Sequence, residues 1–533
     1  MNQEKHLPRV AYFCMEYGLH EDFKIYSGGL GILAGDILKS AKDEGYPMVG
    51  IGILWRQGYT RQLIGKDGRL YDCFPEYRYD FLEDTGVTVS VLIRGRQVKA
   101  KVWKCEKYGN VPLYLLDTNL PQPDFYLTGQ LYGWFEEERI AQEMILGIGG
   151  IRALRKLGIP IDIYHFNDSH PLFAGIELIR EQKNQNGVDF DEALRRVKEH
   201  IVFTTHTPVS AGNEYHRHDI LQYMGAYDGL NYKQMLRIGG SPFSMTAAGL
   251  RLSKRANAVS KLHGETARKM WAGVPGGKSI LSIPNGVHNG TWQDPDICRA
   301  FRESGDLWGT HIKLKRAMLE EVYRRSGIRL REDILTIGFA RRAAPYKRTN
   351  LIFHDENRIR PLLEDRKIQI IFSGKAHPND LAGKRIIEDI LNRTRRYPDS
   401  VVFLEDYDMK IGKILTRGCD VWLNTPVRPM EACGTSGMKA AMNGVLNFSI
   451  LDGWWAEACQ DGINGWQIGK DYTGKRNDEA DSKSLYETLT GKILPAFQNK
   501  DIWIRMMRES IKMSIDRFSS ARMLKEYYER LYM

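Results

Sequence analysis

One pattern recurs along the chain: a short apolar stretch that ends in polar or basic residues. The clearest examples are VAYFC (10–14), IDIYHFND (161–168), HIVFTTH (200–206), DILTIGFARR (333–342), IQIIFSGK (368–375) and VWLNTP (421–426). This pattern is typical of buried parallel strands. In doubly wound sheets, the polar residues at the carboxyl ends of the strands face the ligand. Because 533 residues are too many for one hydrophobic core, the pattern predicts two α/β domains with Rossmann-like sheets.

A glycine-rich loop follows the first strand. The loop is SGGLGILAG (27–35), apolar residues continue at helical spacing up to Gly45, and residues 47–54 form the next apolar stretch. There is no G-x-G-x-x-G and no acidic residue at the end of the second strand, so a nicotinamide cofactor is disfavoured. Residues 55–116 are rich in Tyr, Val and Gly and predict antiparallel strands inserted into this first domain.

A second glycine-rich turn stands directly before a lysine. In RPMEACGTSGMKAAMNG (428–444), GTSG precedes Met438 and Lys439, and the alanines that follow favour helix. The turn therefore predicts a helix start whose backbone N–H groups and dipole attract a phosphate. A lysine beside such a site can lose its proton and form a Schiff base. These two features match the phosphate and the aldehyde of pyridoxal phosphate; the alternative is an ordinary loop before a surface helix.

The segment RRAAPYKR (341–348) places four cations at the end of a predicted strand. Guanidinium and ammonium groups gathered at a strand end indicate an anion site, and a solvated loop is the alternative. Polar residues also end the strands at Asn167-Asp168 and at His206, where they are expected to face a ligand.

Composition excludes several classes of protein. Hydrophobic residues make up 42% and charged residues 27%, as in globular proteins, and no apolar run is long enough to span a membrane. The seven scattered cysteines form no C-x-x-C pair, which favours a reducing cytoplasm over disulfides or a zinc site. Glu214, His216 and His218 have metal-binding side chains, but no third histidine lies nearby, so no metal is expected.

These motifs together resemble a known family. EACGTSGMKAAMNG closely resembles the cofactor-lysine signature of the α-glucan phosphorylases, which act on glycogen, starch or maltodextrin. The glycine loop, NDSHP (167–171), the His206 strand end and RRAAPYKR resemble motifs of the same family in the same order. The resemblance covers residues from about 10 to 470. The glycine loop alone also resembles that of starch synthases, so it identifies the superfamily and not the reaction.

The resemblance implies two Rossmann-like domains facing each other across a cleft, the GT-B type of glycosyltransferase. We expect an N-terminal domain over 1–285, a cofactor-carrying domain over 286–510 and a helix over 511–533 that crosses back to the first domain. The implied reaction is reversible phosphorolysis of terminal α-1,4-linked glucose to glucose 1-phosphate, with retained configuration. The chain is shorter than the large regulated members, so control by a phosphorylated N-terminal segment is not expected.

The resemblance also implies a role for each matching residue. Lys439, Arg341, Arg342, Lys347 and His206 are the expected catalytic residues. The cofactor, pyridoxal phosphate, would contact Lys439, Gly434, Thr435, Lys347, Trp292 and Tyr407. The substrates would contact Gly29, Leu30, Asn285, Glu431, His206 and Arg342. Two positions depart from the family: Arg341 replaces a lysine, and Cys433 replaces a serine, whose hydroxyl is a stronger donor than a thiol.

Three alternatives remain. The first is a glycogen or starch synthase that uses a sugar nucleotide, and the second is a catalytically inactive glucan-binding protein. The third is nucleic-acid binding, suggested only by the net charge of +10. The phosphorylase interpretation predicts an α-1,4-glucan and phosphate or glucose 1-phosphate as partners, in the cytoplasm, without nucleic acid or membrane; a homo-oligomer is left open.

Overall fold

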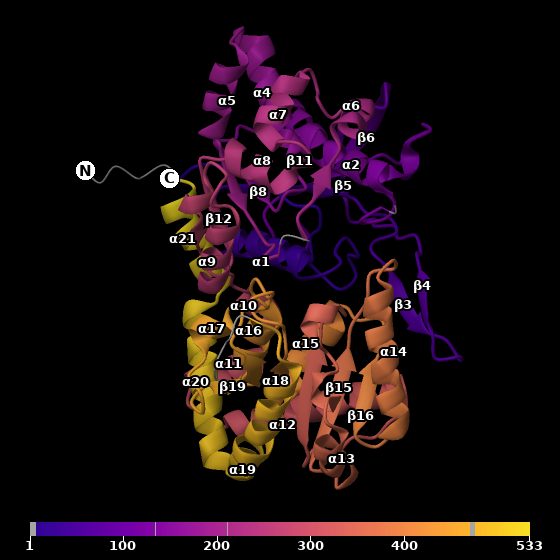
Figure 1. Ribbon diagram of the computed structural model, residues 1–533, viewed down its shortest axis with the longest axis vertical. Helices are drawn as coiled ribbons and strands as arrows, with labels where there is room; N and C mark the ends of the chain where they lie inside the picture. The colour runs from indigo at the N-terminus through magenta and orange to yellow at the C-terminus, as the bar shows by residue number, and fades with distance from the viewer. Residues whose placement is uncertain (1–6, 134, 210–211, 470–474) are drawn as a thin grey trace, which may run out of the picture. The chain divides into compact units, whose positions relative to one another are not determined.

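The computed structural model describes residues 7–133, 135–209, 212–469 and 475–533, which form two compact units (Figure 1). Unit 1 comprises Met1–Tyr59, Phe74–Pro284 and Met523–Met533. Unit 2 comprises Thr60–Cys73 and Asn285–Arg522. Each unit has its own sheet and its own buried apolar residues.

Unit 1 is built on a nine-stranded sheet with the order β13-β12-β9-β8-β1-β2-β7-β6-β5. The strands are β1 (Val10–Phe13), β2 (Met48–Ile53), β5 (Glu83–Ile93), β6 (Arg96–Cys105), β7 (Leu113–Asp117), β8 (Ile163–Asn167), β9 (Ile201–Thr204), β12 (Arg255–Ala258) and β13 (Leu281–Ser282). Neighbouring strands are parallel from β13 to β7, and β6 and β5 add an antiparallel edge. β1 is buried throughout because both faces of the sheet are covered.

The helices of unit 1 follow the strands, as expected for crossover connections. They are α1 (Gly29–Asp43), α2 (Glu136–Met144), α3 (Gly150–Lys156), α4 (Phe173–Asn186), α5 (Phe190–Lys198), α6 (His218–Met224), α7 (Tyr232–Gly239), α8 (Met245–Leu252) and α9 (Lys261–Met270). A short pair, β10 (Tyr215–His216) and β11 (Phe243–Ser244), joins two of the loops. A π-helical turn at Ile145–Gly149 joins α2 to α3.

Unit 2 is built on a six-stranded parallel sheet with the order β16-β15-β14-β17-β18-β19. The strands are β14 (Leu335–Ala340), β15 (Ile368–Ser373), β16 (Val401–Leu404), β17 (Val421–Asn424), β18 (Leu446–Ile450) and β19 (Gly465–Ile468). Together with the unit 1 sheet, this arrangement confirms the predicted α/β architecture of two Rossmann-like domains.

The helices of unit 2 pack on this sheet, with α14 on β16 and α18 on β19 (Figure 1). They are α10 (Asn289–Trp292), α11 (Pro295–Arg302), α12 (Leu307–Ser326), α13 (Glu356–Glu364), α14 (Leu381–Arg396), α15 (Met409–Gly418), α16 (Thr435–Ala441), α17 (Trp455–Ala458), α18 (Asp478–Thr488), α19 (Leu494–Gln498) and α20 (Lys500–Arg517).

Two segments differ from the expected division of the chain. The hairpin of β3 (Arg61–Ile64) and β4 (Leu70–Cys73) belongs to unit 2, although the sequence places it with the other strands of the first domain. Ion pairs explain its position, because Lys384 bonds Asp72 at 2.5 Å and Arg61 bonds Asp406 at 3.2 Å. At the other end of the chain, α20 belongs to unit 2, and only Met523–Met533 returns to unit 1.

The returning segment is tied to unit 1 by hydrogen bonds. α21 (Ser520–Glu526) leads into a π-helical turn, Tyr527–Leu531, which lies beside β12 (Figure 1). The Tyr532 hydroxyl bonds the buried imidazole of His165 at 2.8 Å, and Lys254 Nζ donates to the Tyr532 carbonyl at 2.8 Å. These contacts place the last residues against the middle of the unit 1 sheet.

All seven cysteines are free. In the part of the chain that the structure describes, no helix is long and apolar enough to cross a membrane.

Candidate active site

The glycine turn before Lys439 forms as predicted. Gly434 precedes α16 with φ 89°, a left-handed conformation that a residue with a Cβ adopts only with strain. No side chain caps the N–H groups of the first helical turn. Lys439 lies in the last turn of this short helix and is buried, with its Nζ 3.6 Å from the centre of the Trp292 ring. The turn, the lysine and the predicted pocket residue Trp292 therefore occupy one region of unit 2.

Asn443 fixes this pair, and the sequence did not single it out. Its Nδ2 donates to the Lys439 carbonyl at 2.8 Å and to the Trp292 carbonyl at 3.0 Å. Its Oδ1 accepts from the Asp294 N–H at 2.7 Å. Because Asn443 is fully buried, replacing it would leave several of these groups without partners. A single amide thus holds α10 against α16 and sets the position of Trp292 on Lys439.

Arg341 and Lys347 converge on one carboxylate. Arg341 follows β14, and its guanidinium bonds Asn424 Oδ1 at 3.0 Å and one oxygen of Glu431. Lys347 Nζ bonds both Glu431 oxygens at 2.6 and 2.5 Å. Burial would raise the pKa of Glu431, but the two cations outweigh it and hold the pKa at about 2. Three predicted site residues therefore form one charged cluster at the carboxyl ends of β14 and β17.

The other two cations of the basic loop behave differently. Arg348 is buried with φ 47°, and it bonds the carbonyls of Thr425 and Pro426 and the carboxylates of Asp478 and Asp481. It therefore has a structural role, and the anion site predicted from four cations involves fewer of them. Arg342, by contrast, is exposed to solvent at the start of the loop.

Other predicted residues lie around the same cluster. Tyr407 follows β16; burial and Asp408 raise its pKa to about 12, against the opposing charge of Arg341. Asn285 is buried, and its Oδ1 has no hydrogen-bond partner among the described residues. The Asn285 side chain also lies within reach of the Cys433 thiol, whose pKa burial raises. Thr435 is partly exposed in the first turn of α16.

Asp452 is a further buried group that the motifs did not reveal. It accepts from the Glu431 N–H at 2.9 Å and so fixes the backbone beside the cluster. Burial raises the pKa of its carboxyl to about 7, despite the hydrogen bond from Glu431. The signal that could have found it is its place directly after β18, at another carboxyl end of the sheet.

In unit 1 the glycine loop is arranged around Glu16. The Glu16 carboxylate accepts from the N–H groups of Ser27 at 2.5 Å and Gly28 at 3.0 Å. A Cβ on Gly31 would lie 2.6 Å from Glu16 Oε2, so only glycine fits there. α1 then begins at Gly29 with no side-chain cap and no acidic residue in its first turn. Binding of an anion by the backbone N–H groups of Gly29 and Leu30 stays a prediction, which this uncapped helix start favours.

His206 lies at the end of β9, beside the end of β8. Its Nε2 contacts Asn167 Oδ1 at 2.6 Å. Burial, reinforced by the neighbouring His263, lowers the pKa of His206 to about 3, so the imidazole is neutral at pH 7. With Nε2–H donating to Asn167, the other ring nitrogen, Nδ1, carries a lone pair.

The next two residues after Asn167 are also held in defined states. Asp168 has φ 69°, an unusual conformation for a residue other than glycine, and burial raises its pKa to about 6. Burial and the charge of Arg139 lower the pKa of His170 to about 3. Unit 1 therefore presents neutral imidazoles at its strand ends, whereas unit 2 presents full charges.

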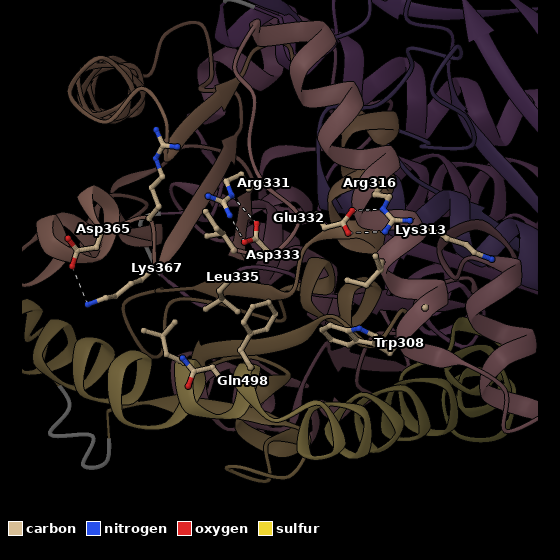
Figure 2. A pocket seen from close by; sticks show the side chains of 16 residues that line it. Trp308, Lys313, Arg316, Arg331, Glu332, Asp333, Leu335, Asp365, Lys367 and Gln498 are labelled. Atoms are coloured by element: carbon tan, nitrogen blue, oxygen red, sulfur yellow. Dashed lines mark hydrogen bonds and ion pairs between the residues drawn. The ribbon is translucent and has the colours of Figure 1, made fainter.

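A cavity of about 1010 Å³ opens elsewhere in unit 2, where β14 and β15 begin. Figure 2 shows that most of its charged lining residues pair with each other: Arg331 with Asp333, Arg316 with Glu332, and Lys367 with Asp365. It contains none of the predicted site residues and is not the candidate active site.

The chain has two Rossmann-like units, and each carries polar or charged side chains at the carboxyl ends of its parallel strands. This arrangement places the chain in the GT-B class of glycosyltransferases. Residues 9–280 match the starch synthase catalytic domain model, and residues 303–462 match the carbohydrate phosphorylase model. The chain is 39% identical, over 98% of its length, to maltodextrin phosphorylase of Thermococcus litoralis, of which the match covers 70%. It is 37% identical, again over 98% of its length, to glycogen phosphorylase of Aquifex aeolicus, of which 86% is covered.

An uncharacterized protein of Methanocaldococcus jannaschii is also 37% identical, and 99% of that protein is covered. On these matches the chain belongs to the carbohydrate phosphorylase family, as its motifs predicted.

Proposed function

We propose that this chain is a pyridoxal phosphate-dependent α-1,4-glucan phosphorylase. It would transfer a terminal α-1,4-linked glucose to phosphate, reversibly and with retained configuration. Family membership supports the proposal, and two relatives are named maltodextrin and glycogen phosphorylase. The observation that carries it is the buried Lys439 amine on the Trp292 ring, in the same unit as the cluster of Arg341 and Lys347.

The residues of unit 2 fit the cofactor. Lys439 offers a buried amine for the cofactor aldehyde, and the aromatic face of Trp292 lies against that amine. Gly434 and Thr435 provide the uncapped turn. Lys347 and Tyr407 are proposed as further residues of the cofactor pocket. When bound, the cofactor supplies a phosphate group that acts as a proton donor and acceptor toward the substrate phosphate.

The cations of unit 2 solve an electrostatic problem of this reaction. Two phosphates in contact repel each other, so fixed positive charges must hold them together. Arg341 and Lys347 are already oriented by Glu431 and Asn424, which lowers the cost of placing them. Glu431 stays ionised at pH 7 and is proposed to accept hydrogen bonds from glucosyl hydroxyls. Arg342, exposed at the loop start, is proposed to bind the substrate phosphate.

Unit 1 is proposed to bind the glucosyl unit and part of the phosphate. The N–H groups of Gly29 and Leu30 would bind phosphate oxygens, and neutral His206 would contact a sugar hydroxyl. In the forward direction the C1–O4 bond of the glucan breaks and a bond forms between C1 and a phosphate oxygen. The proton on the incoming phosphate passes to O4, so the leaving chain departs as an alcohol.

An assay with maltodextrin and phosphate tests the proposal. The purified enzyme should form glucose 1-phosphate, and the reverse reaction should release phosphate and lengthen the glucan. A parallel assay with ADP-glucose or UDP-glucose tests the sugar-nucleotide alternative, which the starch synthase match over residues 9–280 keeps open. Glucan synthesis from the sugar nucleotide, without glucose 1-phosphate formation, would contradict the proposal.

We also place the enzyme in a reducing compartment such as the cytoplasm. The support is that all seven cysteines are free, including the exposed Cys73.

A further inference from the structure

A cluster of buried acidic residues and one histidine lies in unit 1, next to the glycine loop. Glu143 comes from α2, Glu214 precedes β10, and His216 ends it. One donor atom from each side chain lies within 4.8 Å of the other two. The sequence reasoning noticed Glu214 and His216 but found no further ligand, because Glu143 is about seventy residues away and on a helix.

The distances within the cluster do not fit hydrogen bonds. His216 Nε2 is 3.5 Å from Glu214 Oε1 and 3.8 Å from Glu143 Oε2. An N–H···O hydrogen bond spans only about 2.7–3.2 Å. Both His216 Nε2 and Glu143 Oε2 are buried and have no hydrogen-bond partner in the described part of the chain. Two buried polar atoms thus point at one another without bonding, although unpaired buried groups are costly.

These distances are close to those between two ligands of one metal ion. Zinc binds histidine nitrogen and carboxylate oxygen at about 2.0–2.2 Å, so two ligands of a tetrahedral ion lie about 3.3–3.6 Å apart. The 3.5 Å distance to Glu214 falls in this range, and the 3.8 Å distance to Glu143 needs only a small inward shift. The remaining ring nitrogen of His216, Nδ1, contacts Glu136 Oε1 at 3.1 Å. A carboxylate behind the ligating histidine is the usual second contact in metal sites, because it fixes the ring and its tautomer.

The other carboxylate oxygens are held from outside the cluster. Arg139 donates to Glu143 Oε1 at 3.0 Å and to Glu214 Oε2 at 3.4 Å. A bound ion would displace the proton from His216 Nε2. The three carboxylates of Glu136, Glu143 and Glu214 then face the single charge of Arg139, and a divalent cation balances the cluster.

We propose that Glu143, Glu214 and His216 bind a divalent transition-metal ion, with Zn²⁺ as the best-fitting ion. His216 Nε2, Glu143 Oε2 and Glu214 Oε1 are its ligands, and water completes the coordination. Glu214 is partly exposed, which gives water and the ion a path to the site. The ion is structural: it joins α2 to β10 and the residue that precedes it.

The site also borders the glycine loop. Arg139 lies over the Tyr132 ring at 4.7 Å, and the Tyr132 hydroxyl bonds Glu16 Oε1 at 2.6 Å. Glu16 in turn holds the N–H groups of the loop at Ser27 and Gly28. An ion that fixes Glu143 and Glu214 therefore also fixes the base of the loop.

Metal binding to the untagged holoenzyme tests the proposal. After treatment with EDTA and dialysis, equilibrium dialysis against Zn²⁺ with elemental analysis should give about one ion per chain, and Zn²⁺ should raise the Tm. Glu143→Gln and His216→Gln should each lower the affinity at least about 100-fold, and Glu136→Gln about 10–100-fold. A Cys73→Ser background removes the exposed thiol, the main competing ligand.

His218→Gln is the matched control. This histidine lies two residues further on, but its ring nitrogens already contact the Tyr227 hydroxyl at 2.9 Å and the Gly240 carbonyl at 2.7 Å. It should bind Zn²⁺ as the parent does. Glu136 is largely exposed, so Glu136→Gln should fold even if the buried variants do not. No Zn²⁺ bound by the parent, or equal binding by the parent and Glu136→Gln, would overturn the proposal and leave a protonated His216 as the explanation.

Discussion

The strand ends of unit 1 and unit 2 use opposite electrostatics. In unit 1, burial keeps His206 and His170 neutral, with pKa values of about 3. In unit 2, Arg341 and Lys347 lower the pKa of Glu431 to about 2, so that full charges face each other. The same sheet architecture thus presents neutral imidazoles suited to sugar hydroxyls in unit 1, beside an Asp168 that is ionised at pH 7, and paired full charges suited to phosphates in unit 2. The difference comes from a few side chains after the strands and not from the fold.

Lys439→Ala should reduce activity the most, because it removes from unit 2 the proposed anchor of the cofactor. Phosphorolysis should fall by more than about 10²–10³, the factor that one oriented donor contributes in comparable sites. In the parent enzyme, borohydride reduction and peptide mapping should place a pyridoxyl group on Lys439. A fully active parent with no label and no visible absorbance would refute pyridoxal phosphate dependence.

Lys347→Ala and Arg342→Ala should both lower the rate of phosphorolysis but differ in their effect on the Tm. Each should lower the rate about 10²–10³-fold at saturating phosphate. Lys347 is buried against Glu431, so its removal should also lower the Tm, whereas exposed Arg342 should leave the Tm unchanged. Thermal denaturation beside initial rates measures both. A normal rate in the Arg342 variant would remove that residue from the phosphate site.

Glu431→Gln and Asp168→Asn should change stability in opposite directions. The pKa of Glu431 is depressed from 4.5 to about 2, so its stabilisation is complete above pH 4.5 and lost as the pH falls toward 2. The pKa of Asp168 is raised from 3.8 to about 6, so the folded state favours the protonated carboxyl. The contribution of this carboxyl to the free energy of unfolding is lost as the pH rises through 6. At pH 8, Glu431→Gln should destabilise by on the order of 3 kcal/mol and Asp168→Asn should stabilise by on the order of 1–2 kcal/mol.

Urea unfolding at pH 4 and pH 8, in phosphate-free buffer, measures both variants. The Asp168→Asn gain should nearly vanish at pH 4. Changes of the same sign in the two variants at pH 8 would mean that the two units do not differ in the way described.

Arg341→Lys should have the smallest effect. The Arg341 guanidinium contacts both Asn424 and Glu431. A lysine ammonium keeps the positive charge, but it cannot contact both partners with the forked geometry of a guanidinium. The KM for phosphate should rise a few-fold, more than the KM for glucan, and Arg341→Ala should be worse in both directions of the reaction. Should Arg341→Ala match the parent, Lys347 and Arg342 would carry the anion site without it.

The sequence predicts those features that depend on local spacing. The parallel strands, both glycine turns and the residues directly after the strands are encoded within a few positions, so Lys439 and His206 could be named from local spacing. Glu431 could be named only through the family resemblance. Arg348 shows the limit of this reasoning, since its cation lies in the same motif but bonds two carboxylates far along the chain. Motif membership does not determine where a long side chain points.

Features that depend on distant partners could not be predicted. Asn443 acts through carbonyl groups of two helices, and Glu143 meets His216 only because α2 passes beside β10. The hairpin of β3 and β4 has ordinary strand composition, and ion pairs such as Lys384 with Asp72 decide which unit holds it. In each case the information lies in a pairing of residues that no single stretch contains.

The chain passes between the two units four times, after Tyr59, Cys73, Pro284 and Arg522. During synthesis, the His165 imidazole in the middle of the first sheet must therefore wait for Tyr532, which lies 367 residues further along the chain. Unit 2, in turn, needs a hairpin that was made before most of unit 1. Neither unit can be finished, or expressed intact, as a continuous piece of the gene, so the two halves of this enzyme have to mature together.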